Sequence, residues 1–105
     1  MALDANTGSI ISRELAENLI KAYDDRFPGE VISSFIGSNN VMSILEQEGC
    51  IGIRIYNGYD VDNQITKLVL VGVDEEEREL LDDGVIYDEI ATCPPMCPID
   101  GLFVK

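Results

Sequence analysis

Large apolar residues recur every four positions between residues 11 and 27, and charged side chains fill the opposite side of that segment. The apolar members are Ile11, Leu15, Leu19, Tyr23 and Phe27. This spacing predicts an amphipathic α-helix whose apolar face needs a partner surface. Ser9 or Ser12 can cap its start, because a serine hydroxyl accepts a hydrogen bond from the first helical turn. Pro28-Gly29 ends it, because proline disfavours helical geometry at the preceding residue.

A second apolar stripe at helical spacing predicts a shorter helix over residues 38–48. Ser38 offers a cap at its start, and Gly49 suits the left-handed position just past a helix end. The segment between the two helices, residues 30–37, is compatible with either a short strand or a buried helical turn.

Residues 50–56 change to a period of two, which predicts a β-strand. Isoleucines occupy one face, and the other face carries Cys50, Gly52, Arg54 and Tyr56. Residues 66–73 are rich in valine and leucine on both faces, as in a central strand. Because the loop between them is rich in turn-forming residues, the two strands are expected to pair as an antiparallel hairpin.

These elements predict an α+β fold of two layers, in which both N-terminal helices cover one face of a small antiparallel sheet built around the 50–56 and 66–73 hairpin. The side chains expected to meet are Ile51, Ile53 and Ile55 from the sheet and Leu15, Leu19, Ile44 and Leu45 from the helices.

The remaining segments complete one domain over residues 9–105. Residues 1–8, small and polar, are expected to form a disordered leader. Residues 74–84 are an acidic excursion with at most one helical turn, and 85–90 read as a third, shorter strand. Residues 91–105 contain three prolines and are expected to form an irregular tail.

The net charge of the chain argues against two classes of partner. The chain has 20 acidic and 7 basic residues and a formal net charge of −13. Such a field repels phosphate backbones and anionic lipid headgroups, so neither nucleic acid nor a membrane is an expected partner. The N-terminus carries no basic region followed by an apolar run, and the protein is therefore predicted to be cytoplasmic.

Little in the sequence indicates catalysis. The chain has no histidine, the most frequent general base, and no glycine-rich phosphate-binding motif. Asp60, Asp62 and Gln64 stand at alternate positions like the start of a calcium loop, but the glycine and glutamate that such a loop requires are absent. These observations favour a non-enzymatic protein with no cofactor.

Three cysteines are the remaining candidates for chemistry. An odd count in a cytoplasmic chain predicts reduced thiols rather than a disulfide framework, and no bound metal. The alternative is a thiol-based metal or redox site that uses Cys50, Cys93 and Cys97, because three thiolates are able to hold iron or zinc. The stretch around Gly49, Cys50 and Gly52 with the C-terminal pair is similar to the A-type iron–sulfur carriers. In those proteins, however, the terminal pair is C-x-C.

A wider resemblance rests on "ILEQEGCIGIRIYNGYD" (44–60), "LVLVGVD" (68–74) and "CPPMCP" (93–98). These stretches resemble an uncharacterised family of short bacterial proteins with the pattern GCxGIRxY, LVLVGVD and CPPxC. The resemblance implies a related fold but no activity, so no functional residues are transferred. This sequence departs from the family in having "EEERE" after "GVD" instead of glycine and asparagine.

The leading hypothesis is a module that binds a protein partner or itself. Arg54, Tyr56 and Tyr59 beside the hairpin are candidate contacts, because arginine and tyrosine are enriched at interfaces. The 50–56 strand carries a single charge and no proline, so its edge is open to pairing. Either the 85–90 strand or the 30–36 segment covers that edge within the chain, or a second subunit does. A symmetric homodimer is therefore predicted.

Overall fold

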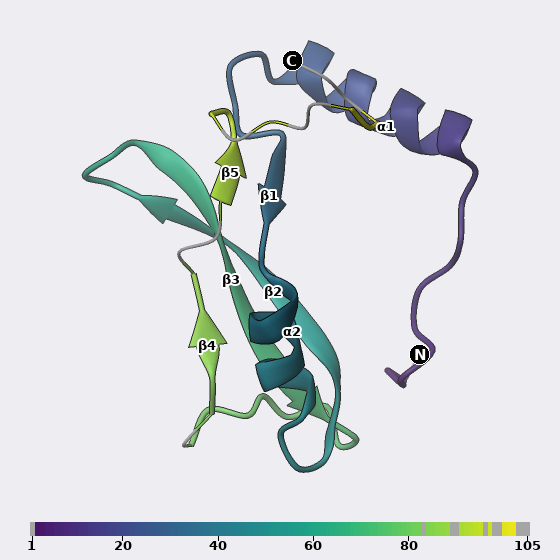
Figure 1. Cartoon of the computed structure of the whole chain (residues 1–105), viewed down its shortest axis with the longest axis vertical. Coiled ribbons are helices and arrows are strands. Elements are labelled where there is room, and N and C mark those ends of the chain that lie inside the picture. The colour runs from purple at the N-terminus through teal and green to yellow at the C-terminus, as the bar shows by residue number, and fades with distance from the viewer. Residues whose placement is uncertain (1, 83, 89–90, 96, 98–99, 103–105) are drawn as a thin grey trace.

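The described part of the chain forms two helices and two small antiparallel sheets, which confirms the α+β class (Figure 1). The computed structural model describes residues 2–82, 84–88, 91–95, 97 and 100–102. The elements in chain order are α1 (Arg13–Arg26), β1 (Ser33–Phe35), α2 (Ser38–Leu45), β2 (Cys50–Asp60), β3 (Ile65–Asp74), β4 (Ile86–Tyr87) and β5 (Ala91–Cys93).

Helix α1 begins and ends where its sequence signals lie. The Ser12 hydroxyl accepts a hydrogen bond from the Leu15 amide at 3.1 Å, which satisfies one of the unpaired donors of the first turn. The helix ends at Arg26, and Gly29 takes a positive φ of 85° in the turn that follows. A residue with a side chain rarely adopts that conformation, so the glycine fits the turn.

Strands β2 and β3 form one long hairpin that runs further than the predicted 50–56 and 66–73 segments. Their pairing is unbroken from Gly52 opposite Val73 to Asp60 opposite Ile65. The tip is a tight loop in which Asp60 Oδ1 accepts a hydrogen bond from the Asn63 amide at 3.2 Å. The added pairs extend the ladder from Asn57 opposite Leu68 to the tip, and each contributes to the pairing.

A β-bulge at the start of β2 changes one predicted face. The register shifts between Cys50 and Gly52, so Ile51 is the extra residue of the bulge. Strict alternation placed Cys50 on the side of Arg54. The bulge instead turns Cys50 to the side of Gly72, where its sulfur is 3.1 Å from the position of a Cβ on that glycine.

The core lies where α2 packs on β3. Strand β3 has neighbours on both sides, and its Leu70, Val71 and Val73 are buried. Ile44 of α2 has no exposed surface and contributes the helix side of the core. The prediction of a helix on the hairpin is thus confirmed for α2.

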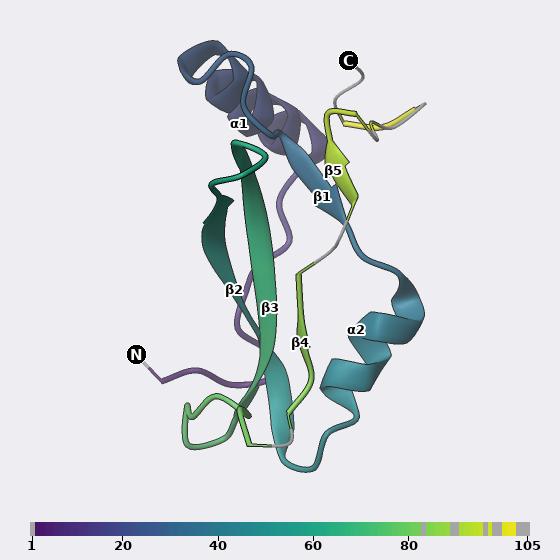
Figure 2. The ribbon, with the colours of Figure 1, turned by 90° about the vertical axis from the view of Figure 1, so that its left-hand side faces the viewer.

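The apolar face of α1 does not cover the sheet, and this part of the predicted architecture is wrong. None of the residues of α1 is buried, and Leu15 and Leu19 remain exposed. Ile55, expected beneath them, is 57% exposed. Figures 1 and 2 show α1 at the end of the molecule that also holds β1 and β5, while α2 lies along the other half of the hairpin.

The ambiguous 30–37 segment contains strand β1, which pairs with β5 far along the chain. Ser33 lies opposite Cys93 and Phe35 opposite Ala91. The tail predicted as irregular from residue 91 therefore begins with a strand. The third predicted strand, 85–90, is confirmed in part as β4: Ile86–Tyr87 pair with β3, and residues 89 and 90 lie outside the described part of the chain.

The acidic excursion is a turn rather than a helix. The Asp74 carboxylate accepts hydrogen bonds from the Glu76 and Arg78 amides, both at 2.9 Å, and the Leu80 amide donates to the Gly72 carbonyl. The leader also contains a turn, in which the Thr7 hydroxyl accepts a hydrogen bond from the Asp4 amide at 3.0 Å.

We predict that Gly72→Ala destabilises the protein by about 1–3 kcal/mol, because the added methyl group would overpack the contact of β3 with the turn after α2 and with the segment after β3. A Cβ at this position would lie 2.9 Å from Gln47 Nε2 and 3.2 Å from Leu80 Cδ1. Gly52→Ala is the matched control, since a Cβ there meets nothing within 4 Å. Urea unfolding of both variants measures the difference. Equal stabilities would contradict this account of the core.

Candidate functional site

Strand β2 lies at the edge of the three-stranded sheet. The strand order is β2-β3-β4, so β3 is the central strand and β2 has one neighbour among the described residues (Figure 2). The two segments that could have covered this edge, 85–90 and 30–36, contain β4 and β1. Strand β4 pairs with β3 and β1 pairs with β5, so neither pairs with β2. The outer edge of β2 is therefore the first candidate for an interaction site.

The two halves of this edge differ in exposure. The first half, Ile51–Arg54, is half-buried, and the leader lies beside it: Leu3, Asp4, Ala5 and Thr7 line a cavity of about 310 Å³ with these residues. The second half is open, and Ile55, Tyr56, Asn57 and Tyr59 are all exposed. The accessible part of the edge is thus the stretch 55–59.

Arg54 and Tyr56 form one cluster around Glu79, which lies in the segment after β3. Arg54 Nη1 is 3.0 Å from Glu79 Oε2, and the Tyr56 hydroxyl donates a hydrogen bond to the same oxygen. The hydrogen bond from Tyr56, followed by the one from Arg54, lowers the pKa of the Glu79 carboxyl. The same bond raises the pKa of the Tyr56 hydroxyl, because ionisation would set a phenolate against the carboxylate.

This cluster is a brace and not a catalytic centre. A general base works best with a pKa near the ambient pH. Here the pKa of Glu79 moves further below neutrality and the pKa of Tyr56 further above it. The three side chains instead tie β2 to the segment that follows β3.

Tyr59 does not join Arg54 and Tyr56. The pairing of β2 has no irregularity between Ile53 and Asp60, so residues of even and odd number point to opposite faces there. Tyr59 therefore lies on the face of Ile55, and the two together expose apolar surface at the edge. The three predicted contact residues form two separate features of one strand.

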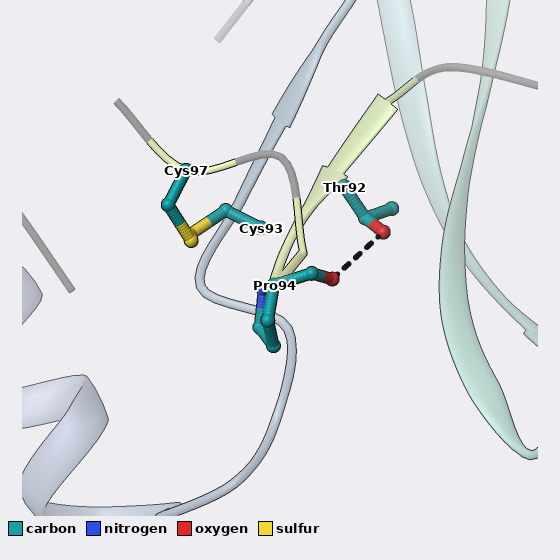
Figure 3. The surroundings of a disulfide bond; sticks show 4 residues. All are labelled: Thr92, Cys93, Pro94 and Cys97. Carbon is teal, nitrogen blue, oxygen red and sulfur yellow. Dashed lines mark hydrogen bonds between the residues drawn. A yellow bond between two sulfur atoms is a disulfide. The ribbon is translucent and has the colours of Figure 1, made fainter. Parts of the chain in front are cut away.

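Cys93 and Cys97 form a disulfide, so the expectation of reduced thiols is wrong for this pair (Figure 3). Cys93 ends β5 and is only 1% exposed. Next to it, the Thr92 hydroxyl donates a hydrogen bond to the Pro94 carbonyl at 3.2 Å. The disulfide fixes the chain after β5 against the β1–β5 sheet.

Cys50 is a free thiol and lies elsewhere. It begins β2, and Figures 1 and 2 place the start of β2 and the end of β5 at opposite ends of the molecule. Its thiol donates a hydrogen bond to the Gly52 carbonyl at 3.3 Å. The structure thus separates Cys50 from the other two cysteines. No group of three metal-ligating side chains occurs within the described residues.

The sequence did not identify two residues whose side chains join separate elements, Glu79 and Gln47. Glu79 belongs to the acidic excursion predicted over residues 74–84, and it is the shared acceptor for Arg54 and Tyr56. Gln47 joins α2 to the chain before β4: its Nε2 donates to the Ile44 carbonyl at 3.0 Å and its Oε1 accepts from the Val85 amide at 3.1 Å. Neither residue has a sequence signal, because each partner is set by tertiary structure.

Comparison with known proteins finds no match, whether among family models, curated proteins or solved structures. Within the part of the chain that the structure describes, no helix has the length and apolar character needed to cross a membrane.

We predict that Glu79→Gln lowers the pKa of Tyr56, because the amide leaves no carboxylate beside the phenol. Ultraviolet titration of the tyrosines measures this, with Tyr56→Phe to assign the transition. In the wild type the brace stabilises the fold above the acidic pKa of a free glutamate and below the pKa of the Tyr56 phenol. The difference in stability between wild type and Glu79→Gln should therefore shrink at both extremes of pH. An unchanged tyrosine titration would exclude the brace.

We also predict that the unfolded protein, prepared without reductant, presents one reactive thiol per chain, from Cys50, and three after reduction. Titration with a thiol reagent in denaturant counts them. Three thiols without reduction would show that the Cys93–Cys97 bond does not form.

Proposed function

We propose that this chain is a non-enzymatic module that self-associates as a symmetric homodimer through the outer edge of β2. The observation that supports this most strongly is the open edge itself. Strand β2 is eleven residues long and has a partner on only one side within the described residues. Its unpaired amide and carbonyl groups form a template for a further strand.

The area of the chain supports a large interface. Its accessible surface is 7983 Å². A folded monomer of 11.6 kDa is expected to expose about 5,800 Å², so the excess is roughly 2,100 Å². Obligate homodimers bury in total about 2,000–5,000 Å², or about 1,000–2,500 Å² per subunit. The excess thus equals what one subunit of such a dimer covers.

The spread of the chain agrees with this area. The radius of gyration of the Cα atoms is 15.3 Å. A compact domain of 105 residues is expected to have a value of about 13 Å. The chain is therefore less compact than a typical domain of its length and buries fewer side chains. Contacts with a second chain would supply the missing burial.

A second copy fits the edge better than a foreign strand. Identical strands that meet about a two-fold axis run antiparallel, which is also the arrangement of the three strand pairs among the described residues. The strand also carries little of the net charge of −13, with Arg54 inside it and Asp60 at its end. Salt screens the remaining repulsion within about 8 Å at physiological ionic strength.

A different protein that adds its own strand is the second occupant to consider, because β-strand addition is a common mode of peptide recognition. The thiol-based metal or iron–sulfur function has less support, since Cys50 lies apart from the disulfide-bonded Cys93 and Cys97. Membership of the uncharacterised bacterial family stays a prediction.

The cytoplasmic location also stays a prediction, and the disulfide makes it testable. Disulfides persist mainly in oxidising compartments. Rapid alkylation of thiols in intact cells, followed by mass spectrometry of the Cys93–Cys97 peptide, measures the state of the pair. A fully oxidised pair would argue against a cytoplasmic protein.

We predict that Ile55→Lys weakens the dimer by at least about 10-fold in Kd, because it places an unpaired charge in the apolar part of the edge in each subunit. Ile55 is exposed in the single chain, so the substitution should leave the fold intact. Sedimentation equilibrium over a range of concentrations measures the mass and the Kd.

Val61→Lys is the matched control. Val61 lies in the loop at the hairpin tip and is 76% exposed, so it changes the net charge equally without touching the edge. This variant should dimerise as the wild type does. A wild-type protein that sediments as a monomer at low and physiological salt alike would refute the proposed function.

A further inference from the structure

An extended apolar surface lies open on α1. Its apolar stripe consists of Ile11, Leu15, Leu19, Tyr23 and Phe27, all of them exposed. The rings of Tyr23 and Phe27 are in contact, with centroids 5.2 Å apart. Leu19, at the centre of the stripe, is 57% exposed. Soluble monomers rarely leave an unbroken apolar surface of this kind in water.

The helix turns a different face toward its own chain. The least exposed side chains of α1 are Ala16, Glu17, Ile20 and Asp24, all half-buried. At about 100° per residue these positions lie to one side of the stripe, and two of the four are acidic. The side of the helix nearest its own fold is thus less apolar than the side left open.

Charge makes the stripe suitable for contact between two acidic chains. The four acidic residues of α1 are Glu14, Glu17, Asp24 and Asp25, and each points more than a quarter turn away from Leu19 at the centre of the stripe. Two of them are paired with basic residues on the far side, Arg13 with Glu17 at 3.3 Å and Lys21 with Asp25 at 2.8 Å. The stripe itself contains no carboxylate, which favours contact with a second copy of this chain despite its net charge of −13.

The stripe is also continuous with the open half of β2. Leu19 and Tyr23 line a groove of about 370 Å³ whose other walls include Asn57 of β2 and Leu68 of β3. Asn57 lies in the exposed stretch 55–59. One partner molecule is therefore able to cover the helix and the edge at the same time.

We propose that the stripe of α1 packs antiparallel against the same stripe of a second copy, with Leu19 next to the two-fold axis. In this arrangement Leu15 lies opposite Tyr23 of the partner subunit. A parallel pair would place Arg26, on the same side as the stripe, against its own copy and align the two helix dipoles. The antiparallel pair avoids both repulsions. The inference rests on the homodimer proposed above. It assigns to α1 a part of the excess accessible surface that the dimer would bury.

A cysteine pair tests the position of the axis. Leu19→Cys should form a disulfide between subunits within the native dimer under mild oxidation, because the two Cβ atoms meet there. Lys21→Cys is the control, since position 21 lies on the opposite side of the helix and its side chain is exposed. The wild type, which contains Cys50, reports any background. Non-reducing electrophoresis separates the products. Equal crosslinking of both variants would overturn the proposal.

A charge substitution tests the contribution to affinity. Leu19→Glu should raise the Kd of the dimer by about 30-fold or more, as for a central interface residue. Asn18→Glu adds the same charge outside the stripe and should change the Kd by less than about 3-fold. Circular dichroism shows whether the helix is retained in both. Because Leu19 is exposed in the single chain, neither change removes a core contact.

The outcomes separate this inference from the proposed function. A dimer that Ile55→Lys disrupts and Leu19→Glu leaves unchanged overturns the role of α1 while the pairing through β2 stands. A wild-type monomer at all concentrations overturns both, and the stripe then serves a different protein.

Discussion

The antiparallel ladder between β2 and β3 is the interaction on which the rest of the structure depends. It is the longest contact in the chain, and it gives β3 a neighbour on one side while β4 supplies the other. Because β3 is central, its Leu70, Val71 and Val73 are buried, and α2 with its buried Ile44 packs against the β2–β3 hairpin. The glycine at position 72 lets α2 approach closely enough for Gln47 to reach Val85.

The same ladder also explains what the fold lacks. One hairpin with one short extra strand offers few inward-facing positions, and a single short helix fills them. Helix α1 is also amphipathic, but no further area of the sheet is left for it to cover. A chain with 46% hydrophobic residues therefore has only five buried apolar side chains among the described residues and keeps its apolar helix face in water. The unpaired edge of β2 and the uncovered face of α1 have the same cause, which is that the small sheet offers too little area to bury both.

The sequence predicted the elements well where local physics decides them. Ser12 and Gly29 bracket α1 as expected, and alternating isoleucines place β2. The position of α1 was not predictable in this way, because amphipathicity shows that a helix needs a partner and not which surface provides it. The pairing of β1 with β5 and the bulge at Ile51 depend on contacts that no local pattern records. For the candidate site, the weak defence of the β2 edge was readable from its single charge, whereas Glu79 as partner of Tyr56 was not.

Amide hydrogen exchange along β2 tests the central claim most directly, since it reports on the edge itself. Amides of β2 that point away from β3 face no further strand among the described residues, so a second strand is expected to be what protects them. The account predicts that such amides within residues 55–59 are protected at high protein concentration and lose that protection on dilution, in step with dissociation. Rapid exchange of these amides at every concentration, beside protected amides of β3, would contradict it.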